Sequence, residues 1–268
     1  MSNFHNYIKS VRAAGHHSFT MMDALSNLGV SRNAVICGMY KLKKKGDIIS
    51  PAKNLYVIVP PEYQAIGCLP ADELVPILMN HWGLPYYVCL LSSALYHGAS
   101  HQKPQVFQVM VDKQLKPIIC GKVKIEFIYK KSLESLPTKK IPIKTGYLVI
   151  ATPELTAMDL VIYPHHAGGL NNIATVLSEL IEEIDPEKLM ILLEHSEKKS
   201  CAQRLGYILE HIESMEAEKQ KRIIQSIYQY ITNKSLVPVA LAPGLSTKGK
   251  SRDHRWMIIE NTDIESDL

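Results

Sequence analysis

The side chains best suited to molecular recognition lie within one short stretch, residues 31–53. Arg32 and Asn33 are adjacent, and these residue types pair with guanine and adenine, respectively, through two hydrogen bonds each. Lysines follow them, and lysine suits the phosphate groups of a DNA backbone. This pattern indicates that the protein binds nucleic acid rather than catalyses a reaction. The candidate DNA-contacting residues are Ser31, Arg32, Asn33, Tyr40, Lys41, Lys43, Lys44 and Lys53.

Two helices and a tight turn must position these residues. Thr20 is a good N-cap for a short helix over residues 21–28. Gly29 opens the turn, and Ser31 is a good N-cap for a second helix over residues 32–45. Gly46 ends that helix, because glycine accepts the left-handed backbone conformation of a helix C-terminus.

A hairpin is expected directly after the second helix. Residues 47–50 and 55–59 are short apolar runs, and residues 51–54 between them are typical of a hairpin tip. Helix, turn, helix and hairpin is the order of a winged helix-turn-helix, which places one helix in the DNA major groove and the wing beside it. An amphipathic helix over residues 3–14 completes the predicted three-helix head.

Apolar spacing assigns the faces of the second helix. Val35, Met39 and Leu42 recur at i, i+4 and i+7, which puts them on one face. The residues of the first helix expected to pack on them are Met22, Leu25 and Leu28, with Ile48 and Leu55 from the hairpin. The residues then turned away from the core are Arg32, Asn33, Ile36, Tyr40, Lys43 and Lys44, with Cys37 and Lys41 on the flanks.

Charge is distributed unevenly along the chain. Residues 1–60 hold eight Lys and Arg against two Asp, a formal charge of +6, whereas the other residues together carry −2. Such asymmetry favours a nucleic-acid partner for the first segment. A lysine run at a helix end also complements the helix dipole, and some winged helices bind protein instead. Turn, caps and wing together favour DNA.

The remaining composition is that of an ordinary globular protein. The hydrophobic fraction is 46% and the charged fraction 21%. The first residues do not resemble a signal peptide, and no apolar run approaches the ~20 residues that span a bilayer. The five cysteines are scattered without a CxxC pair, which favours reduced thiols and a cytoplasmic location over a zinc site or a disulfide framework.

The chain is long enough for two domains, and the predicted fold class is α+β. We expect a winged helix-turn-helix over residues 1–62 and a mixed α/β domain with a helical C-terminal part over residues 70–240. Residues 241–268 are expected to form a loosely ordered tail. A helix beginning after Thr152, with Pro153 at its first position, lies in the second domain.

The sequence contains only weak signals for a catalytic or metal-binding site. His97 and His101 are four residues apart, but Gly98 interrupts any helix between them, so neither a metal site nor a cofactor is predicted. Asp159 is expected to be a helix cap or a helix-surface carboxylate, and Arg204 could pair with a neighbouring acid such as Glu179 or Glu183. No carboxylate cluster, phosphate loop or nucleophile motif indicates an enzyme, and no catalytic residue is assigned.

At the level of motifs the chain resembles the AbiEi-type antitoxins, the DNA-binding half of a type IV toxin–antitoxin (abortive-infection) pair. The motifs that carry this resemblance are Ser31-Arg32-Asn33-Ala34-Val35, Tyr86-Tyr87-Val88-Cys89-Leu90-Leu91-Ser92-Ser93-Ala94-Leu95-Tyr96-His97-Gly98, Ala151-Thr152-Pro153-Glu154-Leu155-Thr156-Ala157-Met158-Asp159-Leu160-Val161 and Arg204-Leu205-Gly206-Tyr207.

The resemblance implies a winged-helix head followed by an α/β antitoxin domain with a helical end. It implies repression of the chain's own operon through promoter inverted repeats, and neutralisation of a nucleotidyltransferase-type toxin without need of a stable complex. Its implied partners are double-stranded DNA and that toxin, with no membrane. Two alternatives stay open: a winged-helix regulator that senses a small ligand, and a nuclease fused to a DNA-binding head.

Overall fold

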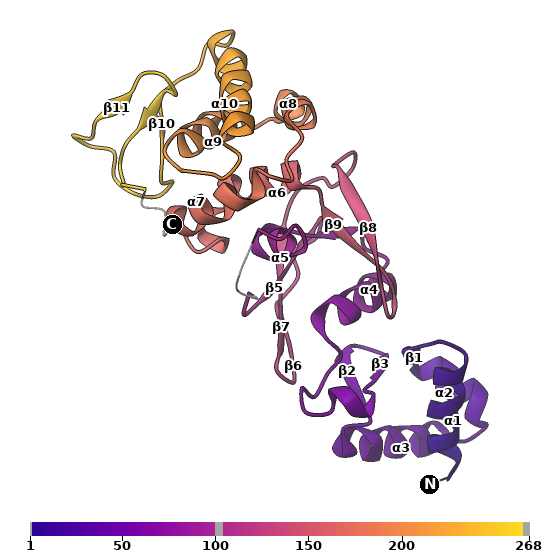
Figure 1. Cartoon of the computed structure of the whole chain (residues 1–268). Helices are drawn as coiled ribbons and strands as arrows, with labels where there is room; N and C mark the ends of the chain where they lie inside the picture. The colour runs from indigo at the N-terminus through magenta and orange to yellow at the C-terminus, as the bar shows by residue number, and fades with distance from the viewer. Residues whose placement is uncertain (1, 100–103, 265–268) are drawn as a thin grey trace. The chain divides into compact units, whose positions relative to one another are not determined.

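The computed structural model of the chain describes residues 2–99 and 104–264 and divides into two units. Unit 1 comprises Met1–Tyr87, Gln105–Glu134 and Lys140–Val149, and unit 2 comprises Val88–Pro104, Ser135–Lys139 and Ile150–Leu268. The α+β class predicted from the sequence is confirmed, since helices and several sheets alternate along the chain (Figure 1). The two units interleave in sequence and therefore do not coincide with the predicted domains 1–62 and 70–240.

Residues 2–60, which we call the head, form the first part of unit 1. The elements of the head, in order, are α1 (Ser2–Ala13), β1 (Ser18–Thr20), α2 (Met21–Leu28), α3 (Arg32–Lys45), β2 (Ile48–Ala52) and β3 (Leu55–Ile58). The strands form an antiparallel sheet in the order β1-β3-β2, with Ile49 opposite Val57 and Phe19 opposite Tyr56. Strand β1 was not predicted, because three residues are too few to show alternation.

The hairpin is tighter than the sequence predicts. Pro51 and Ala52 were expected in its tip, but both belong to β2, and only Lys53 and Asn54 form the turn. Proline is tolerated there because β2 is an edge strand, where a missing N–H costs no ladder hydrogen bond. Asn54 adopts φ 62°, a left-handed conformation that asparagine accepts more readily than most residues.

The core of the head forms where α1, α2 and α3 meet the sheet. Val35, Met39 and Leu42 are buried as predicted, and Phe19 stacks on Tyr56 at 5.5 Å between ring centroids. The expected contact of Met22 is wrong: this side chain is 68% exposed, and the neighbouring Met21 packs on the core instead. Adjacent methionines leave the inward face of a two-turn helix ambiguous in sequence.

The rest of unit 1 supplies one helix and most of a sheet. After η1 (Pro61–Tyr63) come α4 (Ala71–Trp82), β5 (Phe107–Val111), β6 (Ile118–Cys120) and β7 (Val123–Tyr129). Strand β7 pairs in parallel with β5, Val109 opposite Phe127, and antiparallel with β6, Ile119 opposite Lys124. The six-stranded sheet also includes β4 (Tyr86–Val88), β8 (Thr138–Ile143) and β9 (Gly146–Ala151), in the order β6-β7-β5-β4-β9-β8.

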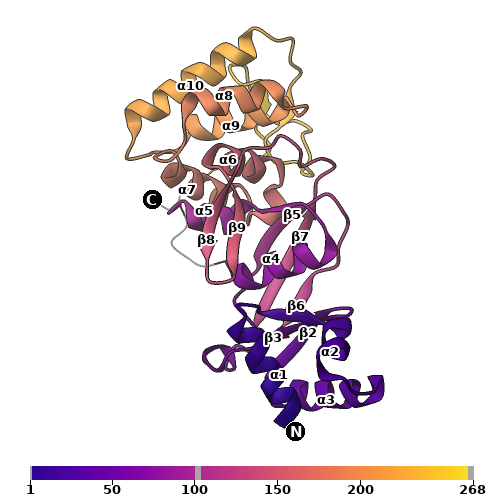
Figure 2. The same ribbon diagram turned by 90° about the vertical axis from the view of Figure 1, so that its right-hand side faces the viewer.

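Unit 2 is mainly helical. Its helices are α5 (Leu90–Tyr96), α6 (Pro153–Ile162), η2 (Pro164–His166), α7 (Leu170–Leu180), α8 (Pro186–His195), α9 (Ser200–Glu210) and α10 (Ala217–Thr232). Figure 2 shows α6 among α5, α7, α8 and α9, all of which it contacts. Because α6 is enclosed in this way, Asp159 is fully buried, and the expected helix-surface position is wrong.

The C-terminal segment differs from the predicted loose tail. Residues up to 264 are described, and they include the short strands β10 (Val239–Ala240), β11 (Arg252–Asp253) and β12 (Ile258–Ile259). Trp256 is fully buried against Gly206 of α9, and Gln203 of α9 donates hydrogen bonds to three backbone carbonyls of this segment, at 3.1–3.3 Å. Residues 265–268 of the predicted tail lie outside the described residues.

The predicted ion pair of Arg204 is also replaced by a backbone contact. Its Nε donates to the carbonyl of Ala240 in β10 at 2.9 Å, so Arg204 holds the C-terminal segment rather than Glu179 or Glu183. Within the described residues, no helix is both long and apolar enough to cross a membrane.

Candidate nucleic-acid interface

The start of α3 is fixed by local hydrogen bonds that the sequence predicts. The Ser31 hydroxyl accepts a hydrogen bond from the backbone N–H of Ala34 at 3.3 Å. Just before it, Gly29 ends α2 in the left-handed region at φ 60°. Thr20 and Asp23 form a reciprocal capping box at the start of α2, with distances of 3.2 and 2.7 Å. These caps fix where α2 begins and ends and where α3 begins.

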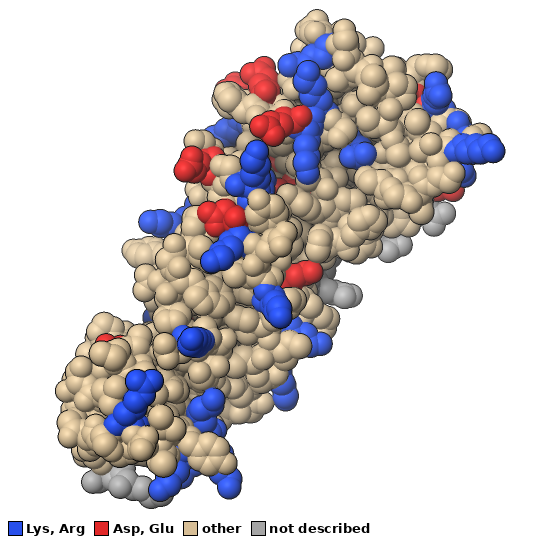
Figure 3. Space-filling view, turned by 180° about the vertical axis from the view of Figure 1, so that it is seen from behind, with Lys and Arg blue, Asp and Glu red and all other residues tan. Residues whose placement is uncertain are grey.

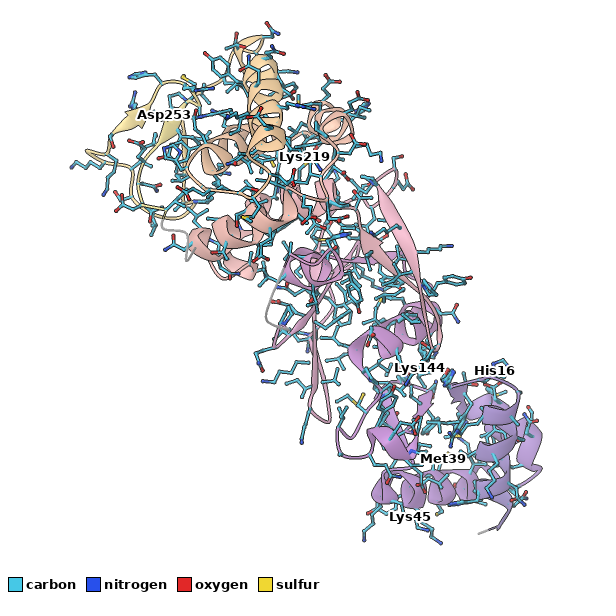
Figure 4. The ribbon with its side chains drawn as sticks, in the orientation of Figure 1. His16, Met39, Lys45, Lys144, Lys219 and Asp253 are labelled. Atoms are coloured by element: carbon cyan, nitrogen blue, oxygen red, sulfur yellow. The ribbon has the colours of Figure 1, made fainter. Side chains whose placement is uncertain are left out.

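Helix α3 separates an inner face from an outer one. Val35, Met39 and Leu42 point into the head, and Gly46 ends the helix at φ 79°, its N–H donating to the Lys43 carbonyl at 3.0 Å. Figure 4 shows Met39 inside the head and Lys45 at its outer surface. The outer face retains large side chains, since Tyr40 is 67% exposed and Ile36 47% exposed.

All the predicted DNA-contacting residues are exposed. Arg32, Asn33, Tyr40, Lys43 and Lys44 lie along α3, with Ser31 at its N-terminus. Lys41 lies apart from that group, because it lines a pocket with Phe4 of α1 and Cys37. The structure thus divides the predicted residues of α3 between its outer face and the flank toward α1.

Lys53 comes from the turn between β2 and β3. Its side chain is exposed, and its backbone carbonyl accepts a hydrogen bond from Nε2 of His81 in α4 at 3.0 Å. The turn is therefore held by α4 within unit 1. No local pattern marks this support, because His81 lies 28 residues further along the chain.

Positive charge extends beyond the head within unit 1. Unit 1 holds 16 Lys and Arg against 8 Asp and Glu, a formal charge of +8, while unit 2 carries −4. Figure 3 shows Lys and Arg side chains on the surface of the head, with acidic side chains scarce beside them. The exposed lysines of the β6–β7 hairpin, Lys122 and Lys124, lie beyond the basic segment that ends at residue 60. Their alternation with apolar residues in β7 was the available signal.

The histidine pair His97 and His101 was considered as a source of metal ligands, and the structure gives His97 a backbone hydrogen-bond partner. Nε2 of His97 lies 2.8 Å from the Ala151 carbonyl, and the side chain is buried. Burial lowers the pKa of His97, although the hydrogen bond to Ala151 opposes that effect. Among residues 2–99 and 104–264, no three His, Cys, Asp or Glu side chains gather as metal ligands would. His101 lies outside the described residues.

Comparison with known families identifies the middle of the chain. Residues 86–211 match the family model described as the AbiEi antitoxin C-terminal domain. Residues 86–211 are therefore similar to the AbiEi antitoxin C-terminal domain, and the resemblance to AbiEi-type antitoxins predicted from the motifs is confirmed. The matched range takes in residues of both units.

Comparison with solved structures finds a similar fold over nearly the whole chain. The crystal structure of RV2827C protein from Mycobacterium tuberculosis has a similar fold, with a TM-score of 0.68 at 15% sequence identity. The similarity covers 97% of this chain and 91% of the other. Comparison with curated proteins finds no match.

Proposed function

We propose that the chain is the antitoxin of a type IV toxin–antitoxin system and neutralises a toxin of nucleotidyltransferase type. The match of residues 86–211 to the AbiEi antitoxin domain is the observation that carries this proposal. The type and the toxin class follow from the family resemblance. In cells arrested by the neighbouring toxin gene, expression of the chain should restore growth; continued arrest at good expression of the chain would contradict the proposal.

We further propose that the head is a winged helix-turn-helix through which the chain represses its own operon. Its support is the order α2, turn, α3, hairpin, together with the outer face of α3, which carries the exposed residues Arg32, Asn33, Tyr40 and Lys44. In this assignment α3 enters the major groove, the β2–β3 turn is the wing, and the lysines contact phosphates. The positive charge of unit 1 favours the same partner.

The operator proposal has a direct binding test. The full chain should bind the promoter DNA of its own operon with at least about 10³-fold preference over random DNA at physiological salt, the lower range for specific regulators. Scrambling one inverted repeat should remove that preference. Equal affinity for the promoter and random DNA would contradict specific repression. A chain without operator preference that still restores growth would contradict repression but support the antitoxin proposal. The two proposals can therefore be contradicted independently.

A further inference from the structure

Two loops that are distant in sequence touch within unit 1. The backbone N–H of Lys122, at the β6–β7 turn, donates to the carbonyl of Ile66 at 2.9 Å. Gly67 and Gly121 face each other across this contact: a Cβ built on Gly121 would lie 3.0 Å from the Cα of Gly67, and closer still to the Ile66 carbonyl oxygen. Both glycines adopt positive φ, 75° and 57°, so a side chain at Gly121 would be strained as well as obstructed.

A cysteine flanks each of these glycines. Cys68 follows Gly67 and Cys120 precedes Gly121, so the close approach of the two glycines brings the two cysteines near each other. Cys68 is fully buried, whereas Cys120 at the end of β6 is partly exposed. Both are free thiols in the structure. Cys120 is therefore the more accessible of the two residues, and Cys68 is shielded from solvent.

The surroundings of the two thiols also shift their pKa values in opposite directions. The neighbouring Cys68 side chain lowers the pKa of Cys120, with burial opposing it, and the nearby charge of Lys43 in α3 lowers that pKa further. For Cys68 the neighbouring Cys120 side chain, together with burial, raises the pKa. A thiolate is the nucleophile in thiol–disulfide exchange, so Cys120 is the thiol prepared to react first.

We propose that Cys68 and Cys120 are a redox-active dithiol, a modification site that a small disulfide such as oxidised glutathione converts into an intramolecular disulfide. The contact between Ile66–Gly67 and Gly121–Lys122 holds the two sulfurs together for this reaction. The disulfide would join the segment after η1 to the β6–β7 hairpin and close a loop of chain between residues 68 and 120.

The reaction balances in two exchange steps. The Cys120 thiolate attacks one sulfur of oxidised glutathione; the glutathione disulfide breaks, a mixed disulfide forms on Cys120, and one glutathione thiolate leaves and takes up a proton. Cys68 then loses its proton to solvent and attacks the Cys120 sulfur, which releases the second glutathione. The two cysteines are oxidised by two electrons, and one oxidised glutathione is reduced to two glutathione thiols.

The remaining cysteines provide internal comparisons. Cys37 of α3 is exposed, so it would take up glutathione without a partner to release it. Cys89 and Cys201 are buried in unit 2. A Cys37→Ser chain thus leaves the proposed pair as the reactive thiols, with two buried cysteines as unreactive references.

The test treats the reduced, folded Cys37→Ser chain with oxidised glutathione and then alkylates it under denaturing conditions. Alkylatable thiols should fall from four to two, with the mass of two hydrogens lost and no glutathione retained. Peptide mapping should find the peptides of Cys68 and Cys120 joined. Four free thiols, a joined pair other than these two, or stable glutathione on both cysteines would overturn the proposal.

Three further variants, in the same background, test the order of the steps and the role of the backbone contact. With Cys68→Ser, Cys120 should retain one glutathione; with Cys120→Ser, Cys68 should retain none. Gly121→Ala should slow disulfide formation at least tenfold, because it forces the two loops apart. Glutathione on Cys68 in the folded Cys120→Ser chain would contradict the assigned order. The mapping of the Cys37→Ser chain decides the pairing even where one of these variants misfolds.

Discussion

At the scale of single residues, the outer face of α3 combines two kinds of contact group. Arg32 and Asn33 offer paired hydrogen bonds at the first turn, where recognition helices reach base edges, and Lys43 and Lys44 offer charge at the last turn. All four side chains are exposed, so their donors are available to a ligand. Base selection and phosphate attraction are therefore assigned to opposite ends of one helix, and substitutions should separate them.

Arg32→Ala should weaken operator binding by about 1–3 kcal/mol, because a paired contact to guanine is lost. The loss should be concentrated at one base position, so a panel of operators with single base changes should show relaxed preference there. Fluorescence anisotropy on that panel measures it. Unchanged affinity for every operator in the panel would remove Arg32 from the interface.

Lys44→Gln should weaken binding to all DNA sequences alike. Loss of one phosphate contact lowers the slope of log affinity against log salt concentration by about one. Titrations at several salt concentrations give that slope. Lys250→Gln, at an exposed lysine of unit 2, is the matched control and should leave the slope unchanged. Equal slopes for both variants would argue against the phosphate contact.

His97 should make the chain less stable in acid. Its pKa is lowered from the usual 6.5 by burial, so the folded protein binds fewer protons than the unfolded chain below that pH. Among the described residues Nδ1 has no hydrogen-bond partner, and protonating it would bury an unpaired donor. Stability from this group is present above pH 6.5 and is lost as the pH falls through the lowered pKa.

Denaturant titrations of the wild-type chain and of His97→Gln, from pH 7.5 to about 5, measure this contribution. The variant should lose less stability across that range than the wild type, whereas the exposed control His195→Gln should match the wild type. Parallel curves for wild type and His97→Gln would show that His97 does not carry the pH dependence.

The position of a residue could be predicted where its neighbours lie close to it in the sequence. Local sequence within one helix predicts Ser31 as the cap and Val35, Met39 and Leu42 as core residues. The structure confirms these assignments. Asp159 and Arg204 were misplaced because their neighbours come from segments remote in sequence, the helices around α6 and strand β10. The DNA-contacting roles of the exposed residues stay predictions.

At the scale of elements, long helices with caps were predictable and short strands were not. Helices α3, α6 and α8 begin after Ser31, Thr152 and Asp185, each of which accepts a backbone hydrogen bond. Strands β1 and β10–β12 have only two or three residues, too few for a period of two to show. Their pairing depends on partners elsewhere in the chain, so no local pattern marks them.

The capping box of α2 should stabilise the head measurably. Thr20→Ala removes the hydroxyl that accepts from Asp23 N–H and should cost about 1 kcal/mol. Thr20→Ser keeps an oxygen at that position and should cost less than half as much. Urea titration followed by far-ultraviolet circular dichroism distinguishes them. A Thr20→Ala chain as stable as the wild type would show that the cap contributes nothing.

The C-terminal strands should be an integral part of unit 2. Trp256→Ala leaves a cavity against α9 and should cost roughly 3–5 kcal/mol of unfolding free energy. Met215→Ala, at a fully exposed side chain, is the control and should change stability by less than about 0.5 kcal/mol. A Trp256→Ala chain with the stability of the control would restore the loose tail expected from sequence.

At the scale of the whole molecule, the interleaving of the two units decides how function can be dissected. A truncation near residues 62–70 would cut through unit 1, which combines the head with residues 61–87, 105–134 and 140–149. Sequence composition places a boundary there because the basic head ends near residue 60, but the backbone of unit 1 continues past it. Point substitutions on α3 in the full chain are therefore the proper means of separating DNA binding from antitoxicity.

Growth of cells that express the neighbouring toxin gene, with and without this chain, is the most direct measurement of the central claim. The full chain and its Arg32→Ala, Lys44→Ala double variant should both restore growth, while only the wild-type chain represses a reporter under the operon's promoter. That result would assign repression to α3 and would show that antitoxicity does not need the DNA contacts of Arg32 and Lys44. Arrested growth with both well-expressed chains would contradict the antitoxin function.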